Sequence, residues 1–163
     1  MGTNVAGPRT PRHFGVRNNA GSTDNGPFIA ITMSVNADRH RIFQVLTVAE
    51  YMETWLVLPE HDRESHLVVA SSPTSFRIEC RKQHQADLSI TGSFRTYRRS
   101  KLLFTWTKQG MIDPGNSVVA IRLYGDFERT TLSLTHSGLG AGVERSWHNE
   151  MWKLSLHKLS CLF

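Results

Sequence analysis

One histidine of this 163-residue chain stands where it could do chemistry. His136 alternates with Leu132 and Leu134 in a strand-like segment, so we expect its ring to point into the interior. An imidazole in that position could hydrogen-bond a ligand or act as an acid or base. The alternative is a core histidine whose ring is satisfied by a hydroxyl or a backbone carbonyl. If the chain is an enzyme, His136 is its expected catalytic residue.

Other signatures of catalysis are sparse. Ser137 follows His136, but neighbouring residues of a strand point to opposite faces, and no G-x-S-x-G motif is present. His148 and His157 are nine residues apart, and no His/Cys cluster has the spacing of a zinc site. The chain also lacks a Gly-rich phosphate loop, an HExxH motif and paired carboxylates. We therefore expect no metal and no cofactor, and we favour a binding protein over an enzyme.

Composition places the chain among ordinary globular proteins. Hydrophobic residues make up 39% of it and charged residues 20%. Its apolar runs are far shorter than the ~20 residues of a membrane span. The first 25 residues lack the apolar stretch of a signal peptide, so we expect a cytoplasmic protein. Cys80 and Cys161 lie in apolar-patterned segments, which predicts two buried free thiols.

The chain is basic, with a formal net charge of +5. Part of the excess is in the N-terminal segment, at Arg9, Arg12 and Arg17, and part flanks an expected strand turn, at Arg95, Arg98, Arg99 and Lys101. No stripe of alternating aromatic and basic residues of the RNA-binding kind appears. We therefore expect a solvated basic surface, with nucleic acid an unlikely partner.

Hydrophobic periodicity predicts the order of the elements. Residues 1–26 are rich in Gly, Asn, Pro, Thr and Arg and indicate a flexible tail, and residues 27–163 are expected to form one domain. The expected elements are a strand over 29–35, helices over 38–46 and 49–55, strands over 66–70, 75–82, 88–97 and 101–107, a strand hairpin over 117–139, and a helix over 143–163.

This order, a strand, two short helices, six strands and a long helix, is typical of an α+β fold. Gly92 interrupts one strand and predicts a bulge or bend, which a curved sheet needs. In the last helix, Trp152, Leu156, Leu159 and Phe163 fall at i, i+4, i+7 and i+11. Such a wide apolar face must lie across the sheet.

From about residue 29 to its last residue, the chain resembles a known superfamily. The resemblance rests on the segments VNADRHRIFQVLTVAEYMETWL, GSFRTYRRSKLLFTW and TTLSLTHSGL, and on the spacing of His148, Trp152, Leu156 and Leu159. These segments resemble the SRPBCC superfamily (the START-related, birch-pollen-allergen helix-grip fold), and within it the bacterial homologues of the activator of heat shock protein 90 ATPase. Met151 stands where that family has a glycine, and SSPTSF replaces a glycine-containing stretch. A methionine there would fill space in the interior or move the helix outward.

The resemblance implies a helix-grip fold, in which a curved seven-stranded antiparallel sheet wraps around the long C-terminal helix. It also implies a mostly apolar pocket between sheet and helix. The residues expected to line it are Trp55, Phe76, Ile78, Phe94, Phe104, Trp106, Leu134, His136, Trp152 and Leu156. The alternative is that these side chains pack solidly and leave no open cavity.

Three functions are compatible with such a fold. The first is non-catalytic binding of a small hydrophobic molecule, such as a lipid, in the pocket. The second is a protein-interaction module like the chaperone activators, with the basic turn at residues 95–101 or the N-terminal tail contacting an acidic protein partner. The third is an enzyme of the cyclase or aromatase type that uses His136. A homodimer is a further option, because exposed edge strands have to be protected.

Overall fold

The computed structural model describes residues 28–59, 62–83, 85–111, 115 and 117–163; the tail expected over residues 1–26 lies outside them. Its strands are β1 (Phe28–Val35), β2 (Ser65–Ser71), β3 (Ser75–Lys82), β4 (Gln85–Arg98), β5 (Lys101–Thr105), β6 (Thr107–Lys108), β7 (Val118–Gly125) and β8 (Thr130–Ser137). Its helices are α1 (Arg39–Thr47), α2 (Ala49–Trp55) and α3 (Val143–Ser160).

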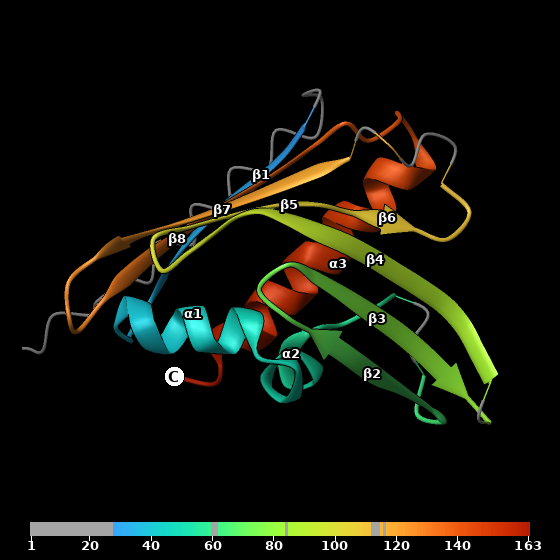
Figure 1. The fold of residues 1–163 in the computed structure, drawn as a ribbon, viewed down its shortest axis with the longest axis horizontal. Coiled ribbons are helices and arrows are strands. Elements are labelled where there is room, and N and C mark those ends of the chain that lie inside the picture. The colour runs from blue at the N-terminus through green and yellow to red at the C-terminus, as the bar shows by residue number, and fades with distance from the viewer. Residues whose placement is uncertain (1–27, 60–61, 84, 112–114, 116) are drawn as a thin grey trace, which may run out of the picture.

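The strands form one curved antiparallel sheet in the order β1-β8-β7-β5-β4-β3-β2. The two-residue strand β6 lies off this path and pairs with β4. α3 lies in the hollow of the sheet, and the two short helices close one side of it (Figure 1). This arrangement confirms the α+β helix-grip fold, with β6 as a short addition to the seven expected strands.

The long strand β4 joins the two halves of the sheet. It pairs with β3 along its first part and with β5 along its last part, and its register with β5 shifts between Phe94 and Thr96. Gly92 lies just before this irregularity. A Cβ atom there would come within 2.4 Å of the Phe76 ring and the Thr105 carbonyl oxygen, so only glycine allows this close approach. The bend therefore brings the aromatic side chains of β3, β4 and β5 together.

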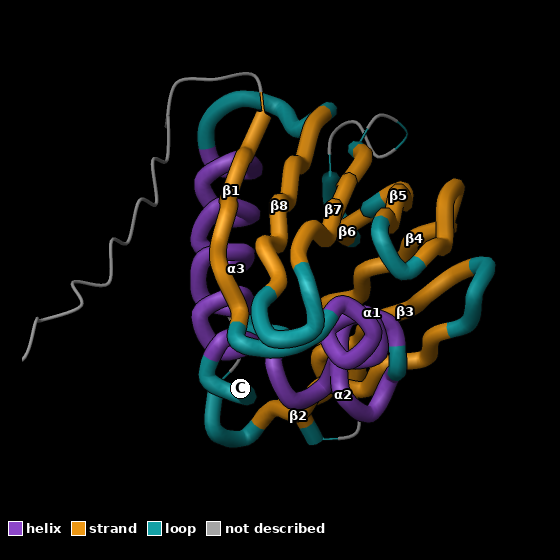
Figure 2. Tube along the Cα trace, turned by 90° about the vertical axis from the view of Figure 1, so that its left-hand side faces the viewer, coloured by secondary structure: helices purple, strands orange, loops and turns teal. Residues whose placement is uncertain are grey.

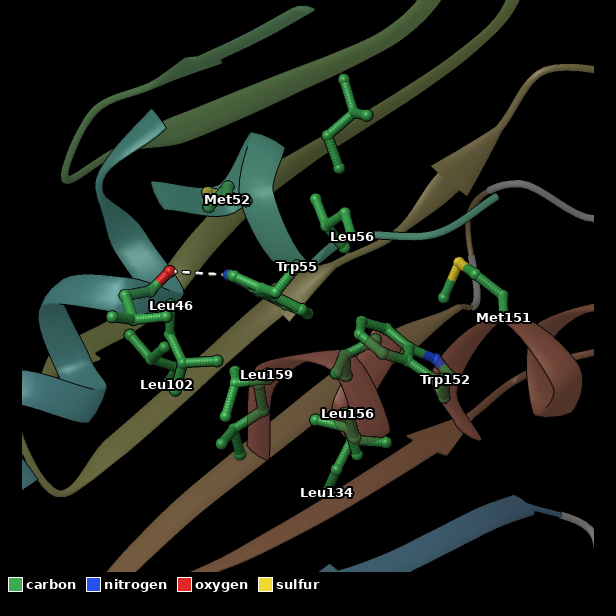
Figure 3. Packing of buried hydrophobic residues seen from close by; sticks show 14 of the residues in the cluster. Leu46, Met52, Trp55, Leu56, Leu102, Leu134, Met151, Trp152, Leu156 and Leu159 are labelled. Carbon is green, nitrogen blue, oxygen red and sulfur yellow. Dashed lines mark hydrogen bonds between the residues drawn. The ribbon is translucent and has the colours of Figure 1, made fainter. Parts of the chain in front are cut away.

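Two hydrogen bonds, one buried and one partly buried, fix the helices to one another. The Trp55 indole N–H in α2 donates to the Val45 carbonyl oxygen of α1 at 2.8 Å, as the dashed line in Figure 3 shows. The Val57 backbone N–H, just after α2, donates to Ser155 Oγ of α3 at 2.9 Å. The covering helices are thus tied to the helix that they cover.

α3 supplies the centre of the core. Trp152, Leu156 and Leu159 are almost completely buried, and each such side chain contributes about 1.5–3 kcal/mol through burial. The helix ends at Ser160, and so it is shorter than the expected span to residue 163. Cys161 caps this end and is exposed, which corrects the expectation of two buried thiols; Cys80 is buried. Among the described residues, no helix is both long and apolar enough to cross a membrane.

Candidate functional site

The space between sheet and α3 holds an aromatic cluster. Phe76, Phe94, Phe104, Trp106 and Trp152 lie in contact, with ring centroids 5.0–6.3 Å apart. The structure therefore brings together aromatic residues from β3, β4, β5 and α3 that the sequence predicts on one inner surface.

The cavity that this cluster encloses is small. It has a volume of about 20 Å³ and is lined by Leu46, Met52, Trp55, Leu56, Phe76, Phe94, Phe104, Trp106, Ile121 and Trp152. Such a volume has room for about one water-sized group. Met151, the neighbour of Trp152, is completely buried and fills space in the core, as Figure 3 shows. Ile78, Leu134, His136 and Leu156, also expected to line a pocket, are buried without bordering this cavity.

His136 lies next to the cluster with both of its ring nitrogens in use. The Trp152 indole N–H donates to His136 Nδ1 at 3.0 Å. Because an indole nitrogen can only donate, Nδ1 must carry a lone pair, and the ring proton is on Nε2. That Nε2–H faces Ser117 Oγ at 2.6 Å, so the serine hydroxyl oxygen accepts it.

This hydrogen bonding limits what His136 can do chemically. Burial, and next the nearby ring of His148, lower the pKa of His136 from 6.5 to about 2, so the ring is neutral. With its lone pair taken by Trp152, it has no basic nitrogen to offer to Ser117 or to a substrate. The geometry is that of a core histidine satisfied by a hydroxyl and an indole.

Two further ring nitrogens near His136 have no hydrogen-bond partner among the described residues. His148 Nδ1–H donates to the Glu144 carbonyl oxygen at 2.7 Å, which leaves Nε2 of the same ring as an acceptor. Neither His148 Nε2 nor the Trp106 indole N–H has a hydrogen-bond partner among the described residues, although both rings are buried. They form one acceptor and one donor beside the aromatic cluster, with ring centroids 6.4 Å apart. No three His, Cys, Asp or Glu residues in the described part of the chain could hold a metal ion.

A second candidate site lies on the surface, at the end of the molecule where two strand turns and the start of a helix meet. The β4–β5 turn, the β7–β8 turn and the start of α1 come together there (Figure 1). Two hollows of about 550 and 400 Å³ adjoin at Arg39, Ser100 and Gly125. We call this surface the basic end and define it by Arg39, His40, Arg99, Lys101, Arg122, Tyr124 and Phe127.

Two exposed aromatic side chains stand in this basic end. Phe127 in the β7–β8 turn is 93% exposed, and Tyr124 at the end of β7 is 51% exposed. The charge cluster in the sequence indicated Arg99 and Lys101 but neither ring, because both rings lie more than twenty residues further along the chain. Only the pairing of β5 with β7, which places Lys101 opposite Arg122, brings the two segments together.

The basic end is positive because its four cationic side chains outnumber the two carboxylates that line the same hollows, Asp38 and Asp126. Both carboxylates are held by local hydrogen bonds. Asp38 Oδ1 accepts hydrogen bonds from the backbone N–H groups of His40 and Arg41, at 2.8 and 3.0 Å. Asp126 Oδ1 accepts from the backbone N–H groups of Glu128 and Arg129, both at 3.0 Å. These bonds lower the pKa of both carboxyl groups.

No ion pair to a carboxylate among the described residues engages the four cationic side chains of the basic end, which are Arg39, Arg99, Lys101 and Arg122. Their charge is thus available to an acidic partner.

Comparison with known proteins gives a family and a fold. A family model described as Activator of Hsp90 ATPase homolog 1-like protein matches residues 36–163. No curated protein matches the chain. Among solved structures, a Chromobacterium violaceum protein aligns with a TM-score of 0.67 at 17% identity, covering 84% of this chain and 97% of that one.

Two further solved structures are similar. An HSP90 activator from Plasmodium falciparum has a TM-score of 0.64 at 18% identity, with 84% of this chain and 96% of that chain covered. The Aha1 dimer from Colwellia psychrerythraea has a TM-score of 0.61 at 13% identity, with 82% and 92% covered. At these identities the likeness is one of fold.

Proposed function

The chain belongs to the family of activator of Hsp90 ATPase homolog 1-like proteins, and we propose that it is a non-catalytic protein-interaction module that binds through the basic end. The observation that carries this proposal is Phe127, whose side chain is 93% exposed within a cationic surface. Aromatic residues, Phe included, and arginine are enriched at protein interfaces relative to the rest of the surface. The interior, by comparison, offers only about 20 Å³.

The partner that fits this surface is an acidic protein segment with an apolar recess. Carboxylates would face Arg39, Arg99 and Arg122, since guanidinium groups pair with carboxylates through two hydrogen bonds. The recess would take the ring of Phe127. Membership of this family, and the likeness of fold to an HSP90 activator from Plasmodium falciparum, make a chaperone of the Hsp90 class the first partner to test.

The test is the affinity of the full chain for a purified Hsp90-class chaperone, measured by calorimetry. We expect Phe127→Ala to weaken binding by about 2 kcal/mol, roughly thirtyfold. Arg99→Glu should weaken binding more at low salt than at high salt, because salt screens the attraction between the charges of the two proteins. Arg63→Glu, an exposed charge reversal outside the basic end, serves as control. Equal affinity of all three variants and the native chain would overturn the proposal.

The second candidate is binding of a small hydrophobic molecule under α3. The observation in its favour is the unpaired donor and acceptor, Trp106 Nε1 and His148 Nε2, beside an aromatic cluster. A ligand would be apolar, would carry one hydroxyl or carbonyl group, and would have to displace side chains, since the cavity admits only a water-sized group. Thermal unfolding with phenol, indole and long-chain alcohols tests this, and an unchanged melting temperature with all of them would reject it.

The third function, a cyclase- or aromatase-type reaction through His136, has the least support. Both ring nitrogens are occupied by Trp152 and Ser117. A reaction would first require Trp152 to leave Nδ1, which would strand a buried indole N–H at a cost of about 1–3 kcal/mol.

A further inference from the structure

The two edge strands of the sheet, β2 and β1, have different surroundings in the described part of the chain. At the β2 edge, the Glu53 carboxylate of α2 accepts a hydrogen bond from the Val69 backbone N–H at 2.8 Å. α2 also packs against β2. A side chain therefore satisfies part of this edge and a helix covers it, which is one way in which proteins prevent edge-to-edge pairing.

Among the described residues, the β1 edge lacks the charges, the proline and the bulge that protect many edge strands, and its contacts with α3 are fewer than those of β2 with α2. Its sequence, FIAITMSV, contains no charged residue and no proline. All eight residues pair with β8 in an uninterrupted register, so no bulge twists the edge away. Because every second residue of an edge strand directs its backbone N–H and C=O away from its neighbour, β1 presents a regular row of groups that no other described strand pairs with.

A groove of about 620 Å³ runs beside this edge. It lies between the first residues of β1 and the outer face of α3, the two elements that run together in Figure 2. Phe28 and Leu154 line it and are 44% and 42% exposed. Glu150 and Lys153, both exposed, give its helical wall charges of both signs. A strand added to β1 would thus find apolar and polar contacts beyond its backbone hydrogen bonds.

We propose that β1 pairs antiparallel with β1 of a second copy of this chain, which extends the sheet across a two-fold axis. Two-fold pairing sets a strand against itself, so any charge near the axis would face its own copy. FIAITMSV meets that requirement in every register, since it holds no charge. The mixed charges of Glu150 and Lys153 are also what a self-complementary flank needs, because each sign finds its opposite on the other copy.

Pairing at β1 is independent of the proposed function, because the basic end and the β1 edge are lined by different residues. Their salt dependence differs as well. Two copies each carry a net charge of +5, so screening should strengthen the dimer, whereas it should weaken binding of an acidic partner.

Analytical ultracentrifugation of the full chain over a concentration series tests the proposal. We expect a dimer of twice 18.5 kDa at high concentration. Thr32→Lys, an exposed position in the middle of β1, should raise the dissociation constant by about tenfold or more, because it places like charges near the axis. Ser93→Lys adds the same charge at an exposed position of the interior strand β4 and should leave the dissociation constant unchanged. Circular dichroism confirms that both variants are folded.

Amide hydrogen exchange of β1 identifies the occupant of the edge. Protection of the outward amides of β1 that appears only with dimer formation supports pairing between copies. A chain that stays monomeric at every concentration overturns the proposal. So does a monomer with protected outward amides, since another segment of the same chain would then occupy the edge, and so does a dimer that Thr32→Lys leaves intact.

Discussion

At the scale of single residues, Trp152 determines the tautomer of His136. Its indole N–H fixes which imidazole nitrogen carries the proton, and Ser117 accepts that proton's hydrogen bond. Alternation along β8 was enough to place His136 inward, but the sequence could not identify its partners. Ser117 is nineteen residues away and Trp152 sixteen. A buried histidine therefore carries two interpretations until its hydrogen bonds are known.

The neutral state of His136 predicts a dependence of stability on pH. Its folded-state pKa of about 2 lies below the ordinary value of 6.5, so between these values the unfolded chain binds a proton that the folded chain does not. The free energy of unfolding is then highest above pH 6.5 and falls as the pH drops, by about 1.4 kcal/mol per pH unit from this group. Burial lowers the pKa of His148 too, which adds to the same trend.

Urea unfolding between about pH 7 and pH 4.5 measures this dependence, above the range where carboxylates dominate. His136→Gln should unfold more easily at every pH but with a shallower slope. A flat profile for the native chain, or an unchanged slope in the variant, would show that His136 takes up its proton in the folded protein at the same pH as in the unfolded chain.

At the scale of elements, α3 supplies the centre of the core, and its side chains fill the space between the helix and the sheet. The periodicity of Trp152, Leu156 and Leu159 predicted its buried face, and the resemblance predicted the sheet around it. The volume between them could not be predicted, because it depends on how rings from four elements pack together. The sequence held two signals, Met151 as a large side chain where the family has a glycine, and the stretch SSPTSF, which lacks the family's glycines.

Met151→Ala should therefore reopen the interior. We expect it to lower the free energy of unfolding by about 2–5 kcal/mol and to leave an apolar cavity. Indole should then raise the melting temperature of the variant, since a ligand that binds only the folded state stabilises it. Val143→Ala, at the exposed start of the same helix, should show neither effect. If indole raises the melting temperature of the native chain as much as that of the Met151→Ala variant, the native interior already opens to ligands.

At the scale of the whole molecule, folding gathers residues that the sequence keeps apart. The basic turn at residues 95–101 was visible as a charge cluster, but Arg39, Tyr124 and Phe127 reach it only through the topology of the sheet. The same topology places β1 and β2 at the two edges of the described sheet, and α2 packs against β2. From the basic end, the β1 edge and the filled core, we infer that the protein binds its partners through its outer surface.

A ¹⁵N-labelled NMR titration of the chain with a purified Hsp90-class chaperone separates binding at the surface from binding in the interior. We predict loss or shift of the amide signals of Arg99, Tyr124 and Phe127, with the indole N–H signals of Trp106 and Trp152 unchanged. Shifted interior indole signals with a silent basic end would contradict a protein that binds through its outer surface.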